Sequence, residues 1–178
     1  MQIYEPADDS YFLSDILKEH VPKLLNKNPA LRALEVGCGS GVQLTALKSI
    51  GVKNILGCDI NPKAVDYCKK LGFKCVKSGL FQKVMGKFDL IVFNPPYLPE
   101  DKFDNLPDTS GGKKGDETIL NFLKRLKNYL NKNGKCFLLT SSLTPTARIK
   151  KQFENYNVKL IAKKKLFQEE LYVLELVL

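Results

Sequence analysis

Hydrophobic residues along the chain follow two alternating patterns, short continuous apolar runs and longer stretches with helical spacing. Short runs with almost no polar residue are typical of parallel strands covered on both faces, and Phe88 to Phe93 is the clearest of them. Apolar spacings of three and four residues indicate amphipathic helices, as in Ser10 to Leu25. The alternation predicts a doubly wound α/β sheet, whose ligands bind at the carboxyl ends of the strands.

Glycine and proline mark several expected boundaries. Pro62 suits a first helical turn because its missing N–H would be unpaired there, Gly72 ends that helix, and Asn133-Gly134 is expected to turn into the fifth strand. Helices are expected at Ser10–Leu25, Val42–Ser49, Pro62–Leu71, Asp116–Leu130 and Thr144–Tyr156. Strands are expected at Arg32–Val36, Asn54–Cys58, Phe73–Val76, Phe88–Phe93, Lys135–Thr140, Val158–Ala162 and Leu171–Val177, the last two as an antiparallel pair. Pro95–Gly115 is expected to be the one long loop.

The length and composition fit one globular domain. The chain has 178 residues, of which 44% are hydrophobic; this suffices for one core and is too short for two ordinary domains. The N-terminal stretch lacks a basic start followed by an apolar run, and no apolar stretch approaches the roughly 20 residues of a membrane span. We therefore expect residues 1–178 to form a single cytoplasmic domain without a membrane segment.

The charge of the chain is strongly basic, with a formal net charge of +9. Its lysines are spread along the chain, with a denser run at Lys163-Lys164-Lys165. Diffuse lysine usually reflects a solvated surface, and the alternative is steering toward RNA or a ribonucleoprotein.

The cysteines contain no Cys-x-x-Cys pair, and their number is odd. Both features favour small buried thiols in a reduced protein over a disulfide framework or a zinc site. We therefore expect no metal ligands among them. The five are Cys38, Cys58, Cys68, Cys75 and Cys136.

A glycine-rich turn links the first expected strand to its helix. Gly37, Gly39 and Gly41 allow the backbone to take positive φ and allow a ligand to approach the main chain. Asp59 ends the second strand, where its carboxylate can accept hydrogen bonds from ribose hydroxyls. Together these residues predict a nucleoside cofactor, without separating NAD from S-adenosylmethionine.

Glu35 lies just before the glycines and separates the two cofactors better. Its carboxylate would repel a pyrophosphate and attract the cationic amino group of a methionine moiety. The alternative is that Glu35 only satisfies backbone donors, although a carboxylate buried without a partner is costly. The residue therefore favours S-adenosylmethionine.

The fourth strand delivers Asn94-Pro95-Pro96-Tyr97 to its end, expected beside the first strand. The prolines remove N–H donors and restrict φ, so the turn presents carbonyl oxygens. The Asn94 side-chain oxygen and the Pro95 carbonyl can accept both N–H groups of an amide, and Tyr97 can stack on the planar group. Methyl transfer from a sulfonium needs chiefly geometry, worth about 7–11 kcal/mol. The tetrapeptide predicts a methyltransferase acting on a planar amide or amino nitrogen.

These residues resemble the HemK family of protein glutamine methyltransferases, in its short archaeal and eukaryotic branch. Four further segments carry the resemblance: Tyr4–Ser10 at the N-terminal signature, Leu80-Phe81 beside the adenine, Ser110–Gly115 in a glycine-rich loop and Glu169–Val173 in the last strand. It implies a class I S-adenosylmethionine-dependent methyltransferase fold, Rossmann-like, with seven strands that are mostly parallel and an antiparallel last strand. The expected cofactor-binding residues are Ser10, Glu35, Gly37, Gly39, Gly41, Asp59, Leu80 and Asn94, and the expected catalytic residues are Asn94, Pro95, Pro96 and Tyr97.

The resemblance also implies a substrate and a partner. The substrate would be the glutamine of the Gly-Gly-Gln loop of a class I release factor, and the partner a small zinc-binding activator protein forming a heterodimer. Val76 and the edge of the third strand are the expected docking place. One position departs from the family pattern: Gly79 stands where an acidic residue normally contacts the adenine amino group, and Ser78 could offer an oxygen instead.

Two other functions remain open. The same tetrapeptide would serve an RNA or DNA methyltransferase acting on an exocyclic amino group of adenine or guanine, which the basic charge favours. The absence of an appended recognition domain disfavours it, because base flipping usually needs further contacts. The other is a catalytically silent binding subunit, which only Gly79 supports.

Overall fold

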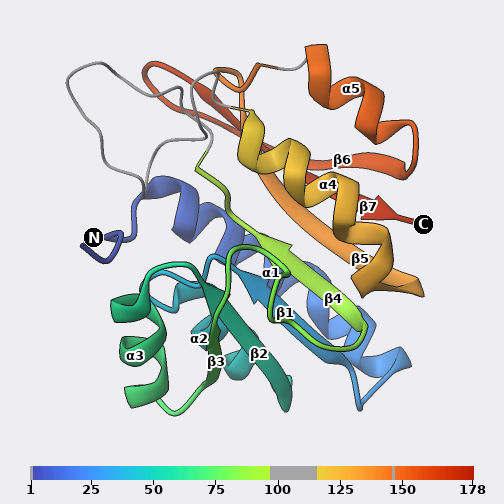
Figure 1. The fold of residues 1–178 in the computed structure, drawn as a ribbon. Coiled ribbons are helices and arrows are strands. Elements are labelled where there is room, and N and C mark those ends of the chain that lie inside the picture. Colours follow the sequence, from blue (N-terminus) through green and yellow to red (C-terminus); the bar gives the residue numbers. More distant parts are fainter. Residues whose placement is uncertain (1, 97–115, 146) are drawn as a thin grey trace.

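The computed structural model describes residues 2–96, 116–145 and 147–178, which form a single seven-stranded sheet flanked by helices (Figure 1). The helices are α1 (Asp8–Lys27), α2 (Val42–Ile50), α3 (Pro62–Lys70), α4 (Glu117–Tyr129) and α5 (Ala147–Phe153). The strands are β1 (Arg32–Val36), β2 (Asn54–Asp59), β3 (Lys74–Lys77), β4 (Phe88–Phe93), β5 (Leu130–Ser141), β6 (Asn157–Lys165) and β7 (Glu170–Val177).

The sheet has the strand order β3-β2-β1-β4-β5-β7-β6. All neighbours are parallel except β7, which runs antiparallel to both β5 and β6. The predicted fold class is therefore confirmed, and so are the pairing of β1 with β4 and the antiparallel pair at the end of the chain. Strand β3 forms one edge of the sheet, with no further strand beside it in the described part of the chain, and this edge is where the docking place was expected.

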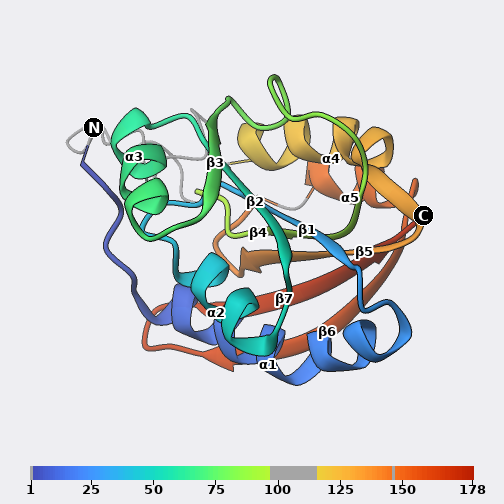
Figure 2. The ribbon, with the colours of Figure 1, turned by 90° about the horizontal axis from the view of Figure 1, so that it is seen from below.

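Helices cover both faces of the sheet, with α1 and α2 on one side and α4 and α5 on the other (Figure 2). Side chains in β4 alternate between the two sides: Leu90 and Val92 join the core under α1, while Ile91 and Phe93 join the core under α4. Because both faces are buried, the strand needs apolar residues on both of them, and Asp89 is its one polar residue. This explains the continuous apolar run from which β4 was predicted.

The start of β5 was predicted wrongly. The strand begins at Leu130, directly after α4, so Asn133-Gly134 lies within it and forms no turn before it. The pairing with β4 shifts register between Phe88 and Leu90, which accommodates the extra residues of β5. A Cβ atom on Gly134 would come within 3.0 Å of the Phe88 carbonyl oxygen. The glycine is needed for this close backbone approach.

Helix α5 is also shorter than predicted, since the Thr144–Tyr156 prediction extends beyond both of its ends. Before the helix, Ser141 N donates to Thr144 Oγ1, 3.0 Å away, and stabilises a turn. After it, Tyr156 N donates to the Phe153 carbonyl in another turn. The predicted loop Pro95–Gly115 falls mostly on residues 97–115, outside the described residues. None of the described helices is long and apolar enough to cross a membrane.

Candidate active site

A cavity of about 350 Å³ lies at the carboxyl ends of β1, β2 and β4. Residues 4–10 and the first turns of α2 and α4 complete its walls, through residues such as Tyr4, Gln43 and Asn121. The predicted site residues that line it are Ser10, Glu35, Gly37, Gly39, Asp59, Leu80, Asn94, Pro95 and Pro96. Gly41 is not among the lining residues, and Tyr97 lies outside the described residues.

The glycine turn takes the backbone conformation that its sequence requires. Gly37, Gly39 and Gly41 have φ values of +67°, +45° and +78°, a region that other residues rarely adopt. Gly41 is the residue that precedes α2, and a Cβ there would lie 3.1 Å from Cys68 Sγ. Gly41 therefore shapes the exit of the turn, while Gly37 and Gly39 expose their backbone to the cavity.

Asp59 ties this turn to the end of β2. Its Oδ2 accepts a hydrogen bond from Gly39 N and its Oδ1 accepts one from Asn61 N, each at 2.8 Å. A carboxylate oxygen can accept more than one hydrogen bond. Asp59 can therefore hold the turn and also accept from a hydroxyl of a ligand in the cavity.

Glu35 is buried at the inner wall of the cavity, with 4% of its surface exposed. Its Oε2 accepts a hydrogen bond of 2.9 Å from Leu44 N, in the first turn of α2. The residue does satisfy a backbone donor, as the alternative interpretation held. Burial nevertheless raises the pKa of the Glu35 carboxyl well above its ordinary value, because a charge is poorly solvated there. A cationic group in the cavity would favour the ionised form.

The side chain of Asn94 is held in one orientation by Asp9. Asn94 Nδ2 donates to Asp9 Oδ2 at 2.8 Å, and an ionised carboxylate only accepts, so the amide nitrogen has to face Asp9. The Asn94 Oδ1 atom is buried and has no hydrogen-bond partner among the described residues. Asn94 thus offers an unused, oriented acceptor in a residue that lines the cavity.

Asp9 is in turn held by the N-terminal segment. Its Oδ1 accepts from Tyr4 Oη at 3.1 Å and from Ser10 N at 2.7 Å. Burial and the Asp9 charge raise the pKa of Tyr4, so the phenol remains a donor. The sequence assigned no role to Tyr4 or Asp9, although both belong to the quoted Tyr4–Ser10 signature, which was the available signal.

Gln43 supplies a second unused acceptor that the sequence did not suggest. Gln43 Nε2 donates to the Ser10 carbonyl oxygen at 2.8 Å, which leaves Oε1 facing the other way. This oxygen is buried without a partner in the described part of the chain, and Gln43 lines the cavity. Buried polar atoms are normally hydrogen-bonded, so two residues that line one cavity and each hold an unpaired oxygen favour a ligand with hydrogen-bond donors.

Leu80 lines the cavity from the segment after β3, with a φ of +52° that is unusual for leucine. Its carbonyl oxygen accepts from Ser78 Oγ at 2.9 Å and from Cys58 Sγ at 3.3 Å. Ser78 Oγ also accepts from Lys83 N. The hydroxyl proton of Ser78 is therefore already donated. Its oxygen keeps only part of its acceptor capacity for the adenine amino group, which the family's acidic residue at position 79 normally contacts.

The sheet with its antiparallel last strand, and the cavity over the ends of β1, β2 and β4, define a class I methyltransferase. Comparisons with known proteins agree. Residues 12–168 match the methyltransferase small domain family. A protein of Methanocaldococcus jannaschii, provisionally named a protein N5-glutamine methyltransferase, is 37% identical over 97% of this chain and 90% of its own length.

Two further relatives extend this result. Methyltransferase HEMK2 of Homo sapiens is 33% identical, over 78% of this chain and 71% of the human protein. The structure of Mtq2 from the E. cuniculi Mtq2–Trm112 complex superimposes with a TM-score of 0.77 over 99% of both chains, at 24% identity, and so shares the fold. The chain therefore belongs to the methyltransferase small domain family and, within it, to the HemK proteins.

Proposed function

We propose that this chain uses S-adenosylmethionine to methylate the side-chain amide nitrogen of the glutamine in the Gly-Gly-Gln loop of a class I release factor. The names of its relatives support this substrate. They include the eRF1 methyltransferase catalytic subunit of Schizosaccharomyces pombe, 29% identical over 77% of this chain, and the bacterial release factor glutamine methyltransferases, such as that of Agrobacterium fabrum, 31% identical over 54% of this chain. The unpaired Asn94 Oδ1 is the observation on which the chemistry rests.

An amide nitrogen carries two N–H donors, and the proposed site provides two acceptors for them. Asn94 Oδ1 accepts one N–H, and the carbonyl oxygen of Pro95 accepts the other. Asp9 prevents Asn94 from turning its own N–H groups toward the substrate. Accepting both donors orients the amide plane and increases electron density on a weakly nucleophilic nitrogen, so positioning replaces a strong base.

The walls of the cavity fit the parts of S-adenosylmethionine, which when bound supplies an electrophilic methyl group on a sulfonium. Glu35 and the Gln43 Oε1 atom are acceptors for its ammonium group, and Asp59 is an acceptor for its ribose. Leu80, which lines the same cavity, is the proposed contact for the adenine. A volume of about 350 Å³ lies within the usual range of small-molecule sites, about 300–1,000 Å³.

Labelled methyl transfer tests the proposal. The purified chain is incubated with methyl-labelled S-adenosylmethionine and a class I release factor, either native or with the loop glutamine changed to asparagine. We expect label only in the native factor, and at least about a 100-fold lower rate with Asn94→Ala, because an oriented polar group at the reacting centre is worth about that much. Cofactor affinity, measured by equilibrium dialysis, should change far less.

Three outcomes would contradict the proposal. Equal labelling of the glutamine-lacking factor would exclude the loop glutamine as the target. Label found only in RNA would assign the site to an exocyclic base nitrogen, the alternative that the net charge of +9 favours. Cofactor binding without transfer to any acceptor, both alone and with the small partner protein proposed below, would identify a silent binding subunit.

We also propose that the chain works as a heterodimer with a small zinc-binding protein, in the cytoplasm where translation factors are found. The structurally similar Mtq2 of E. cuniculi forms a complex with a second protein, Trm112. Here, β3 leaves a sheet edge without a further strand among the described residues, and Tyr67 of the neighbouring α3 and Leu71 directly after that helix are exposed. An unpaired edge beside exposed apolar side chains favours a protein contact.

A further inference from the structure

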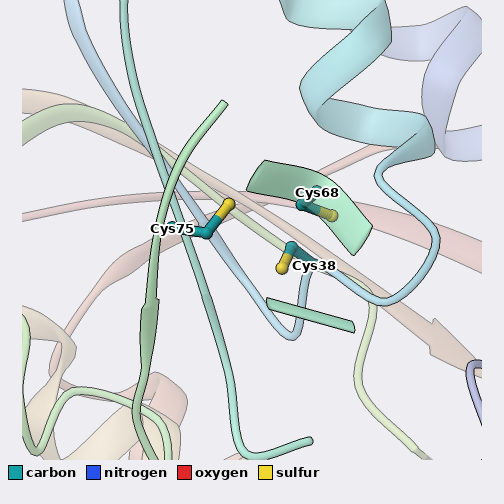
Figure 3. Close-up of side chains that lie close together, drawn as sticks. All are labelled: Cys38, Cys68 and Cys75. Atoms are coloured by element: carbon teal, nitrogen blue, oxygen red, sulfur yellow. The ribbon is translucent and has the colours of Figure 1, made fainter. Parts of the chain in front are cut away.

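Three cysteines from separate elements lie close together in the fold (Figure 3). Cys38 belongs to the glycine turn, Cys68 to α3 and Cys75 to β3. Their sulfur atoms all lie within 4.8 Å of one another, and all three residues are buried. They are separated by 30 and 7 positions in the sequence, which is why no Cys-x-x-Cys pattern revealed them.

The spacing of these sulfurs suits a single metal ion. Metal–thiolate bonds of about 2.3 Å place three ligands of one ion roughly 4 Å apart. Two glycines make room for the sulfurs: a Cβ on Gly57 would lie 2.8 Å from Cys75 Sγ, and a Cβ on Gly41 would lie 3.1 Å from Cys68 Sγ. The absence of side chains at Gly57 and Gly41 leaves the space that these sulfurs occupy, and Cys68 Sγ also donates to the Gly39 carbonyl oxygen at 3.5 Å.

The donor set selects the kind of ion. All three ligands are sulfur, and the cluster contains no fourth histidine, cysteine or carboxylate among residues 2–96, 116–145 and 147–178. Zinc in structural sites almost always has four ligands, whereas soft thiolates also select monovalent copper.

We propose that Cys38, Cys68 and Cys75 form a binding site for a soft d10 metal ion, with Cu(I) preferred over Zn(II). On binding, each thiol that becomes a ligand releases its proton to solvent, and no electrons are transferred. The ion would join the cofactor turn to α3 and β3 through three metal–sulfur bonds. It would therefore fix the turn that carries Gly37 and Gly39.

Metal binding to the purified full-length chain tests this site without any methyl transfer, so its result is independent of the proposed reaction. Cu(I) is supplied without oxygen in competition with a chromophoric Cu(I) chelator, and Zn(II) is tested in a parallel titration. We expect one Cu(I) per chain. Cys75→Ala and Cys68→Ala should each weaken the affinity for Cu(I) at least about 100-fold. Cys136→Ala removes a buried thiol of β5 outside the cluster and should leave the affinity unchanged.

X-ray absorption at the copper edge gives a second measurement, with three sulfur neighbours at one distance expected. Circular dichroism of each variant shows that it is folded. Equal Cu(I) affinity in Cys68→Ala and Cys75→Ala, no binding that competes with the chelator in the native chain, or nitrogen and oxygen neighbours at the bound ion would each overturn the site. Tighter binding of Zn(II) than of Cu(I) would overturn the choice of ion.

Discussion

Asp9 decides which end of the Asn94 side-chain amide is left without a hydrogen-bond partner among the described residues. The two residues are 85 positions apart, and their contact depends on α1 beginning next to the end of β4. The sequence predicted Asn94 as a site residue because it belongs to a contiguous tetrapeptide. It could not identify Asp9, because the partner of a side chain is set by the packing of distant elements.

Replacing Asp9 by asparagine should remove this control. An asparagine at position 9 can donate as well as accept, so the Asn94 amide can rotate and present its N–H groups to the substrate. We expect kcat to fall about 10–100-fold, the equivalent of one hydrogen bond to a charged group, with the dissociation constant of the cofactor changing about threefold at most. Steady-state kinetics and equilibrium dialysis measure the two.

Asp8→Asn is the matched control, because Asp8 is exposed and contacts Lys164. Its kcat should remain that of the native chain. A normal kcat in Asp9→Asn would show that Asn94 is oriented by something else.

Glu35 should make the stability of the ligand-free protein depend on pH. Its folded-state pKa lies well above the ordinary value of 4.5, so above that pH the folded protein holds a proton that the unfolded chain has lost. The free energy of unfolding therefore falls as pH rises from 4.5 toward the folded pKa, by at most about 1.4 kcal/mol per pH unit. Urea unfolding of the native chain and of Glu35→Gln over this range measures the difference.

The Glu35→Gln variant should lack this part of the slope, since its amide can still accept from Leu44 N. Saturating S-adenosylmethionine should reduce the slope in the native chain, because its ammonium group stabilises the ionised carboxylate. Parallel pH profiles for the two proteins would contradict the burial effect on Glu35.

At the scale of the elements, an aromatic stack supports the part of the cavity that Leu80 lines. Phe81 is fully buried and stacks on Tyr129 and Phe122, with ring centroids 4.4 and 5.2 Å apart. It follows Leu80, whose backbone has positive φ. The packing of Phe81 against α4 thus holds the Leu80 backbone beside the cavity.

Phe81→Ala should lower the free energy of unfolding by about 3–5 kcal/mol, as for other buried aromatic residues, and should also weaken cofactor binding. Phe137→Ala gives the comparison, because Phe137 is equally buried but belongs to the core under α1. Phe137→Ala should lower the free energy of unfolding by a similar amount and leave cofactor affinity nearly unchanged. Denaturant unfolding and dialysis would measure both, and equal loss of affinity in the two variants would contradict a specific role for Phe81.

Element types were largely predictable, and element ends were less so. Apolar periodicity is a property of consecutive residues, so β1 and β4 were predicted with their observed bounds. The start of β5 was missed because Asn-Gly is a strong turn signal. In the folded chain, the proximity of the β4 backbone to Gly134 overrides that signal. The proximity of Cys38, Cys68 and Cys75 was also missed. It depends on contacts between distant elements and exists only after β2 and β3 pair.

At the scale of the whole molecule, the free edge at β3 and the neighbouring α3 are the place where we expect the partner. Leu71→Glu introduces a charge at an exposed apolar position of that region, where the side chain is 42% exposed. It should abolish co-elution with the small zinc-binding protein in size-exclusion chromatography and leave the fold intact. Phe167→Glu, at a fully exposed residue between β6 and β7, is the control and should still co-elute.

Strand β7 is the last strand in the sequence, yet it lies between β5 and β6 and contacts α1. Leu13 and Leu17 of α1 share a core with Leu171 and Val173 of β7. A nascent chain still lacking β7 has no complete surface on which α1 can pack, and α1 carries the Asp9 that orients Asn94. The contact between Asp9 and Asn94 should therefore form only after β7 has left the ribosome and paired with β5, so that a nascent chain without β7 lacks the proposed catalytic arrangement.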